Sequence, residues 1–175
     1  MSRWKKKGSR EIARSSIFTM IEDDVVMQDG TEISYTIIDF PDFACVLPVH
    51  EDKFVLIRNY RYPIDEFVLE VPAGLIDEGE SPEATARREL EEETGYILED
   101  IEKLCTYNPI ASLNTQKAHL FIGNAKKGGC KNRDPAEDME VVLVPITEVY
   151  DMLDRDELSH PHTMLALFYA RDRFQ

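Results

Sequence analysis

The sequence has no long apolar run, few cysteines and far fewer basic than acidic residues. No stretch of apolar residues approaches the length that crosses a membrane. The three cysteines, Cys45, Cys105 and Cys130, show no paired spacing, which argues against a disulfide framework or a zinc site and favours a reducing compartment. The formal net charge of −14 repels polyanions. We therefore expect a cytoplasmic protein that binds neither nucleic acid nor membranes.

The chain also lacks internal repeats and low-complexity segments, so its 175 residues favour one domain with a sizeable core. Basic residues cluster only at the start, at Arg3, Lys5, Lys6, Lys7 and Arg10. No apolar segment of the signal-peptide type follows them. We expect this basic segment to be a solvated end of the chain.

Hydrophobic periodicity predicts an α+β fold. Two alternating segments, 17–27 and 32–39, flank the turn sequence 28–31 and predict an antiparallel hairpin. Further strands are expected at 44–49, 54–58, 67–71, 101–107, 118–123 and 139–144, and helices at 82–94, 146–153 and 163–173. The prediction is a mixed sheet flanked by helices, with residues 1–43 as a tail and hairpin extension and residues 44–175 as the core.

The segment from Gly74 to Tyr96 is the most informative part of the chain. Ser81 is a good N-cap and is followed by Pro82, which favours the first helical position. Good helix formers follow, and Gly95 provides a left-handed stop. The sequence therefore predicts a helix between Ser81 and Gly95, with Glu80 in a structural position at the junction between the loop and the helix.

Three glutamates share one face of this expected helix. Glu89, Glu92 and Glu93 stand at i, i+3 and i+4, where like charges repel and weaken a helix. A hard divalent cation reverses that repulsion, and Mg²⁺ prefers oxygen ligands, with Mn²⁺ as a substitute. Arg88 lies four residues before Glu92 and can orient it. The pattern predicts a metal site, and the alternative is a solvated acidic face.

Two histidines, His160 and His162, flank a proline and form another arrangement that can bind a metal. No further thiol or imidazole lies nearby in the sequence, so we favour a surface helix entry for them.

The spacing of Gly74, Glu80, Arg88-Glu89, Glu92-Glu93 and Gly95 resembles the Nudix box. The resemblance implies the Nudix fold, a mixed sheet sandwiched between helices, and hydrolysis of a nucleoside diphosphate linked to another group. Gly74 and Gly95 would then be structural, and the glutamates would hold metal. One departure is Tyr96, which occupies a position that is usually aliphatic.

Beyond the box, the chain resembles the ADP-ribose pyrophosphatase branch. The N-terminal hairpin, the strand that ends at Arg61, the sequence Val71-Pro72-Ala73-Gly74 and the acidic segment that begins at Glu137 carry this resemblance. It implies that Arg61, with Arg58, binds substrate phosphate and that the Ala73 carbonyl is a metal ligand. It also implies that Glu137 acts on the attacking water, with Glu93 as a catalytic metal ligand. The alternatives are ordinary edge-strand or loop charges.

The resemblance thus implies Mg²⁺-dependent hydrolysis of ADP-ribose to AMP and ribose 5-phosphate. A hydrolase of another nucleotide sugar or of a nucleoside triphosphate is an alternative, as is a nucleotide-sensing Nudix module without catalysis. The sequence does not identify the base or the sugar. The branch also implies a homodimer, in which the N-terminal hairpin helps to build the nucleotide pocket.

Overall fold

A computed structural model describes residues 3–132 and 138–174. The chain separates into two compact units. The first comprises residues up to Asp42 together with Tyr107–Lys117, and the second comprises Phe43–Thr106 and the residues from Ala118 onward. No helix among the described residues is long and apolar enough to cross a membrane.

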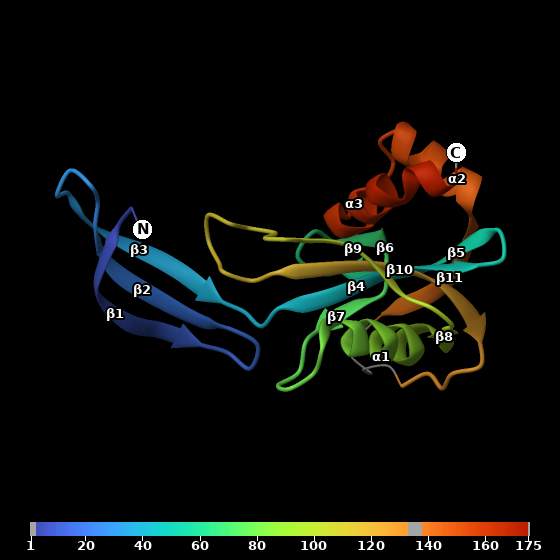
Figure 1. Ribbon diagram of the computed structural model, residues 1–175, viewed down its shortest axis with the longest axis horizontal. Helices are drawn as coiled ribbons and strands as arrows, with labels where there is room; N and C mark the ends of the chain where they lie inside the picture. Colours follow the sequence, from blue (N-terminus) through green and yellow to red (C-terminus); the bar gives the residue numbers. More distant parts are fainter. Residues whose placement is uncertain (1–2, 133–137, 175) are drawn as a thin grey trace. The chain divides into compact units, whose positions relative to one another are not determined.

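The first unit is built on a three-stranded antiparallel sheet in the order β1-β2-β3. Its strands are β1 (Lys5–Arg14), β2 (Thr19–Val26) and β3 (Glu32–Asp39) (Figure 1). The turn between β2 and β3 has Gly30 at φ 88°, which an L side chain adopts only with strain. The N-terminal antiparallel hairpin predicted from the sequence is confirmed.

The basic N-terminal segment is exposed along nearly its whole length, as expected of a solvated end, but it also forms β1, which the sequence analysis did not predict. β1 pairs with β2 along its length, and ion pairs join its basic side chains to β2 and β3. Lys6 Nζ lies 2.8 Å from an oxygen of Asp23, Arg10 pairs with Glu22, and Lys7 pairs with Glu32. Opposite charges facing one another across a sheet stabilise the pairing, and this signal was invisible without knowledge of which strands are neighbours.

The segment Tyr107–Lys117 is tied to β3 by hydrogen bonds. The amide of Ile38 donates to the carbonyl of Leu113 over 3.0 Å, and the Tyr35 hydroxyl donates to the carbonyl of Ser112 over 2.7 Å. The first unit therefore includes a segment that is remote in the sequence, in addition to the predicted extension 1–43.

The second unit contains an eight-stranded mixed sheet. Its main path runs β11-β5-β4-β10-β8, with β6 on β5, β7 on β4 and β9 on β10. The pairing of β4 with β10 is parallel. The strands are β4 (Phe43–His50), β5 (Lys53–Arg61), β6 (Glu66–Glu70), β7 (Ala73–Leu75), β8 (Tyr96–Leu98), β9 (Glu102–Tyr107), β10 (Ala118–Lys127) and β11 (Met139–Pro145).

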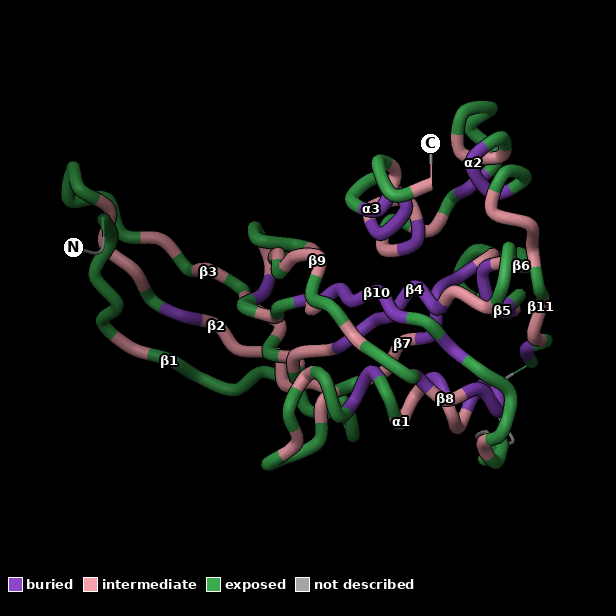
Figure 2. Tube along the Cα trace, turned by 45° about the vertical axis from the view of Figure 1, so that its right-hand side comes forward, coloured by how far each residue is buried: buried purple, intermediate pink, exposed green. Residues whose placement is uncertain are grey.

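Helices cover both faces of this sheet. Figures 1 and 2 place α1 (Pro82–Thr94) on one face and α2 (Ile146–Asp154) and α3 (Pro161–Ala170) on the other. A short 3₁₀ turn, η1 (Arg171–Arg173), follows α3. The expected mixed sheet between helices is confirmed.

The core lies between α1 and the middle of the sheet, where β4 and β10 are buried along most of their length (Figure 2). Ala86 and Leu90 of α1 are fully buried against Val46 and Val55. These residues are four apart on the helix, which is the spacing of one helical face. Glu93 lies on the same side of the helix, seven residues after Ala86, and is also buried, whereas Glu89 and Glu92 lie at the edge of this face and are partly exposed.

Candidate active site

The box helix has the ends that its sequence predicts. Ser81 Oγ accepts the amide N–H of Ala84 over 3.2 Å, and Pro82 occupies the first turn. At the other end Gly95 has a left-handed φ of 74°, and its amide donates to the carbonyl of Glu91 over 2.8 Å. Both caps are local, which is why the sequence predicts them correctly.

Arg88 binds more acidic groups than the sequence analysis expected. Its Nη1 donates to Glu92 over 3.1 Å, as the i, i+4 spacing predicts, and also to Glu89 over 2.6 Å. Its Nε and Nη2 donate to the two oxygens of Glu80 over 3.1 and 3.0 Å, and Nη2 also reaches the carbonyl of Leu75. One guanidinium thus offsets part of the repulsion between Glu89 and Glu92.

Glu80 sits at the junction between the box loop and α1. The Thr85 hydroxyl, which is fully buried, donates to Glu80 Oε2 over 2.7 Å. Hydrogen bonds from Arg88, followed by those from Thr85, lower the pKa of Glu80 to about 2. These contacts fix the loop against the helix, which agrees with a structural position for Glu80.

Glu93 and Glu89 face the strand that precedes the helix. Glu93 is 8% exposed, and its Oε2 accepts the amide N–H of Ala73 over 3.3 Å. A Cβ added at Gly74 would lie 1.9 Å from Glu89 Oε1. Only a glycine therefore allows the Glu89 carboxylate to lie against β7. Ala73 and Gly74 pair in turn with Cys45 and Ala44 of β4, so the sheet holds this strand in place.

The three glutamates can be compared with the ligand set that Mg²⁺ requires. Within the described part of the chain, no three side chains of His, Cys, Asp or Glu are gathered into a metal site as they stand. Glu89 and Glu92 are drawn toward Arg88, and Glu93 toward the Ala73 amide. The donors are nonetheless carboxylates beside backbone carbonyls, which is the chemistry that Mg²⁺ prefers, and they lie on adjoining turns of one helix.

Arg58 and Arg61 of β5 have different surroundings. Arg61 makes a bidentate contact with the buried Glu70, with Nε–Oε1 at 2.7 Å and Nη2–Oε2 at 2.5 Å. Arg58 lies over the ring of Phe67 at 4.9 Å and contacts Glu140 at 3.5 Å. Residues three apart on a strand point to opposite faces, so the structure does not bring these two arginines together.

Arg61 is connected to the box through a short segment of chain. Glu70 ends β6, and three residues later Ala73 donates to Glu93. Arg61 is therefore linked to the box carboxylates through Glu70 and the short segment that leads to Ala73, whereas Arg58 faces β6 and β11.

Glu137 lies outside the described residues. The described residues on either side of it are hydrogen-bonded to the box helix and to β5. The amide of Asn132 donates to the carbonyl of Glu92 over 2.9 Å, and the carbonyl of Asp138 accepts the amide of Tyr60 over 3.0 Å. Tyr60 immediately precedes Arg61.

The sequence did not reveal the contacts by which α3 supports the segment between β6 and β7. The fully buried Thr163 accepts the amide N–H of Val71 over 2.9 Å, and its Oγ1 lies 2.9 Å from His160 Nδ1. Burial lowers the pKa of His160 and that of His162 to about 4, with the charge of Arg61 acting in the same direction. His160 and Pro161 do begin a helix, but the imidazoles are half-buried and not surface groups.

Cys45 lies on β4, opposite Ala73 of β7. Burial raises the pKa of its thiol, and the carboxylates of Glu93 and Glu70 add to this effect. All three cysteines are free thiols, as their spacing in the sequence predicted.

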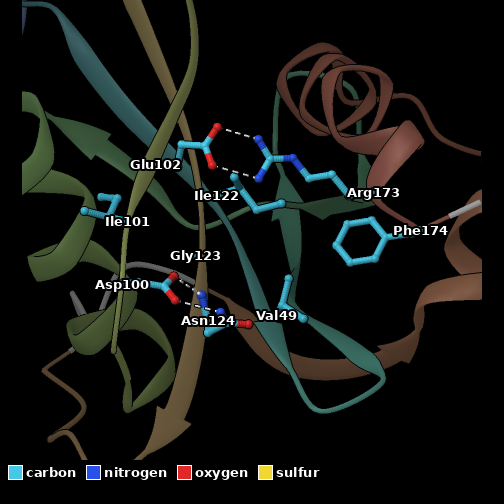
Figure 3. A pocket seen from close by; sticks show the side chains of 9 residues that line it. All are labelled: Val49, Asp100, Ile101, Glu102, Ile122, Gly123, Asn124, Arg173 and Phe174. Carbon is cyan, nitrogen blue, oxygen red and sulfur yellow. Dashed lines mark hydrogen bonds and ion pairs between the residues drawn. The ribbon is translucent and has the colours of Figure 1, made fainter.

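A cavity of about 520 Å³ lies elsewhere in the second unit and is lined by none of the box residues (Figure 3). Its polar groups bind one another. Glu102 makes a bidentate pair with Arg173 at 2.5 and 2.9 Å, and both oxygens of Asp100 accept N–H groups of Asn124 at 2.7 Å. The cavity walls are therefore held together by contacts within this chain.

Known proteins resemble this chain along most of its length. The NUDIX domain family model matches residues 40–167. A methanol dehydrogenase activator from Bacillus methanolicus is 28% identical over 166 residues, which cover 93% of this chain and 90% of that protein. An ADP-ribose pyrophosphatase from Bacillus subtilis (strain 168) is 28% identical over 170 residues, which cover 93% and 92%.

Solved structures give the same result. The crystal structure of an ADP compounds hydrolase matches with a TM-score of 0.87 at 25% identity, covering 99% of this chain and 95% of that one. The box helix, the sandwich around the mixed sheet and the family match all agree. The chain belongs to the Nudix hydrolase family and is similar to its ADP-ribose pyrophosphatase branch.

Proposed function

We propose that this chain is a Mg²⁺-dependent hydrolase of nucleoside diphosphate sugars and that ADP-ribose is its preferred substrate. The observation that carries the proposal is the placement of Glu89, Glu92 and Glu93 on adjoining turns of α1, with Glu93 and Glu89 against β7 (Ala73–Leu75). Arg61 is joined to Glu70, which lies three residues before β7. The name of the Bacillus subtilis relative supports ADP-ribose.

In the proposed reaction, water adds across the diphosphate. One bond between a phosphorus and the bridging oxygen breaks, the water oxygen bonds to that phosphorus, and AMP and ribose 5-phosphate leave. Glu89, Glu92, Glu93 and the Ala73 carbonyl would hold Mg²⁺, which supplies charge neutralisation and activates water. Arg61 would hold a phosphate oxygen by charge-assisted hydrogen bonds. Glu137 would accept the proton of the water.

The names of the relatives alone do not select the substrate. A methanol dehydrogenase activator and an ADP-ribose pyrophosphatase are equally identical to this chain, at 28%. Loss of a box glutamate would favour the alternative of a sensing module without catalysis, but all of them are present here. We therefore place catalysis before sensing.

A substrate panel tests the proposal. We expect kcat/KM for ADP-ribose to exceed that for GDP-mannose and ATP by at least about tenfold, because a site built for one diphosphate ester leaves polar groups unpaired with another. Phosphate and nucleotide products would be measured with saturating Mg²⁺. A tenfold preference for ATP or GDP-mannose contradicts the substrate assignment, and the absence of turnover on all three contradicts the function.

We also propose a homodimer that uses the first unit. A small sheet with exposed apolar residues needs a partner surface, and Ile12 and Ile17 are 48% and 53% exposed in the single chain. An isologous two-fold interface would be the simplest closed arrangement. Light scattering at micromolar concentration should give twice the 20.2 kDa mass of the chain. A fully active monomer would remove both the dimer and its role in the site.

A further inference from the structure

The pair of Arg61 and Glu70 is asymmetric in its burial. The Glu70 side chain is 6% exposed, whereas that of Arg61 is 49% exposed. Their contact is bidentate, through Nε and Nη2 of the guanidinium. A buried carboxylate thus holds one edge of a guanidinium whose body extends toward the surface.

Neutralisation of the buried Glu70 carboxylate does not fully explain why Arg61 contacts it through two hydrogen bonds. A buried ion pair is often no more stabilising than apolar residues of similar volume, because both charges lose their hydration. The two parallel hydrogen bonds from Arg61 to Glu70 also restrict the orientation of the guanidinium. Arginine has five N–H donors in one plane, and the contact with Glu70 uses one from Nε and one from Nη2. In the proposed function, the contact with phosphate would be made through the other edge of the group, which carries the two N–H donors of Nη1 and the second donor of Nη2.

Glu70 is itself held firmly. It stands opposite Ile57 in the pairing of β5 with β6. The next residue, Val71, donates its amide N–H to the buried hydroxyl of Thr163 on α3. Two residues farther on, Ala73 contacts Glu93 of the box. The position of Glu70 is thereby fixed relative to the carboxylates that would hold the metal.

The geometry points to Glu70 as a positioning residue that orients the guanidinium of Arg61 toward the substrate diphosphate. The inference rests on the proposed function, since it requires Arg61 to bind a phosphate. Glu70 touches no reacting atom and acts only through Arg61.

The first experiment is a double-mutant cycle. Glu70→Gln keeps the size of the side chain but loses the charge and the fork. We expect KM to rise about tenfold with a smaller change in kcat, because the phosphate contact acts in both the ground state and the transition state. The double variant Glu70→Gln/Arg61→Gln should be no worse than Arg61→Gln alone, since Glu70 has nothing left to orient.

Glu102→Gln is the matched control. Glu102 also makes a bidentate pair with an arginine, Arg173, at a distance from the box residues. It should leave kcat and KM within twofold of the unaltered enzyme. Multiplicative losses in the double variant, or an unchanged KM in Glu70→Gln, would overturn the inference. An unchanged KM in Arg61→Gln would overturn it as well, while the activity of the unaltered enzyme would still stand.

A measurement on the unaltered protein does not depend on how the Glu70 variant folds or on turnover. The ¹⁵N resonance of Arg61 Nε–H is assigned by its loss in Arg61→Gln. We expect this proton to be protected from exchange with water both before and after addition of Mg²⁺ and inorganic pyrophosphate, because Glu70 keeps hold of Nε. Exchange as fast as that of a free arginine, or loss of protection when pyrophosphate is added, would show that Glu70 does not hold the group.

Discussion

Glu93→Gln is expected to lower kcat about 10³-fold while the protein remains folded. The substitution keeps the length of the side chain, and the amide oxygen can still accept the N–H of Ala73, which now contacts Glu93 over 3.3 Å. It removes the negative charge on the most buried of the three glutamates of the acidic face. A bound metal stabilises transition-state charge by several kcal/mol, and each ~1.4 kcal/mol is a factor of ten in rate.

The measurement is kcat at saturating Mg²⁺, together with thermal unfolding followed by circular dichroism. Glu83→Gln is the matched control, because Glu83 lies in the first turn of the same helix and is exposed. It should retain turnover close to that of the unaltered enzyme. Removal of divalent ions with a chelator should abolish turnover, and Mg²⁺ should restore it. Turnover near normal in a folded Glu93→Gln protein would show that the box does not carry the chemistry.

The parts of the site that the sequence predicts are those determined by local spacing. Ser81 and Gly95 cap a helix through contacts within a few residues, so their roles follow from the order of the residues alone. The same holds for Arg88 and Glu92, which are one turn apart. The period of 3.6 residues also places Leu90 and Ala86 on one buried side of the helix without knowledge of the rest of the fold.

Contacts between distant segments were not predictable in this way. Glu70 and Arg61 are not opposite one another in the pairing of β5 with β6, where Glu70 faces Ile57 and Arg61 faces Glu66, so even the register would not have predicted their side-chain contact. Thr163 supports Val71 from a helix 92 residues away in the chain. Only the packing of α3 on the sheet brings them together.

The partners of the basic N-terminal residues were not predictable for the same reason. Lys6 and Arg10 are typical of a solvated tail when they are considered with their neighbours in the sequence. Their partners, Asp23 and Glu22, lie on the adjacent strand, so the charged segment is both exposed and the outer strand of a sheet. The sequence does show a basic run followed by an acidic strand. Which charges form pairs can be predicted only when the register of the two strands is known.

Gly74→Ala is expected to lower kcat about 100-fold and to raise the Mg²⁺ concentration required for half-maximal activity. The new methyl group would lie 1.9 Å from Glu89 Oε1 and 2.1 Å from its Cδ, so the carboxylate has to move. Displacement of a catalytic group by about 1 Å can cost about 10²-fold in rate. The backbone of Gly74 does not have a positive φ, so alanine introduces a collision and no backbone strain.

The same substitution elsewhere distinguishes this collision from the general effect of replacing a strand glycine. Gly8 also lacks a positive φ, and a Cβ there would meet its nearest neighbour, an Asp24 oxygen, at 3.4 Å. Gly8→Ala should therefore leave kcat and the Mg²⁺ requirement unchanged. If Gly74→Ala lowers kcat at an unchanged Mg²⁺ requirement, Glu89 is not a metal ligand. If both quantities stay normal, the carboxylate can move without consequence, and the role of Gly74 is confined to the pairing of β7 with β4.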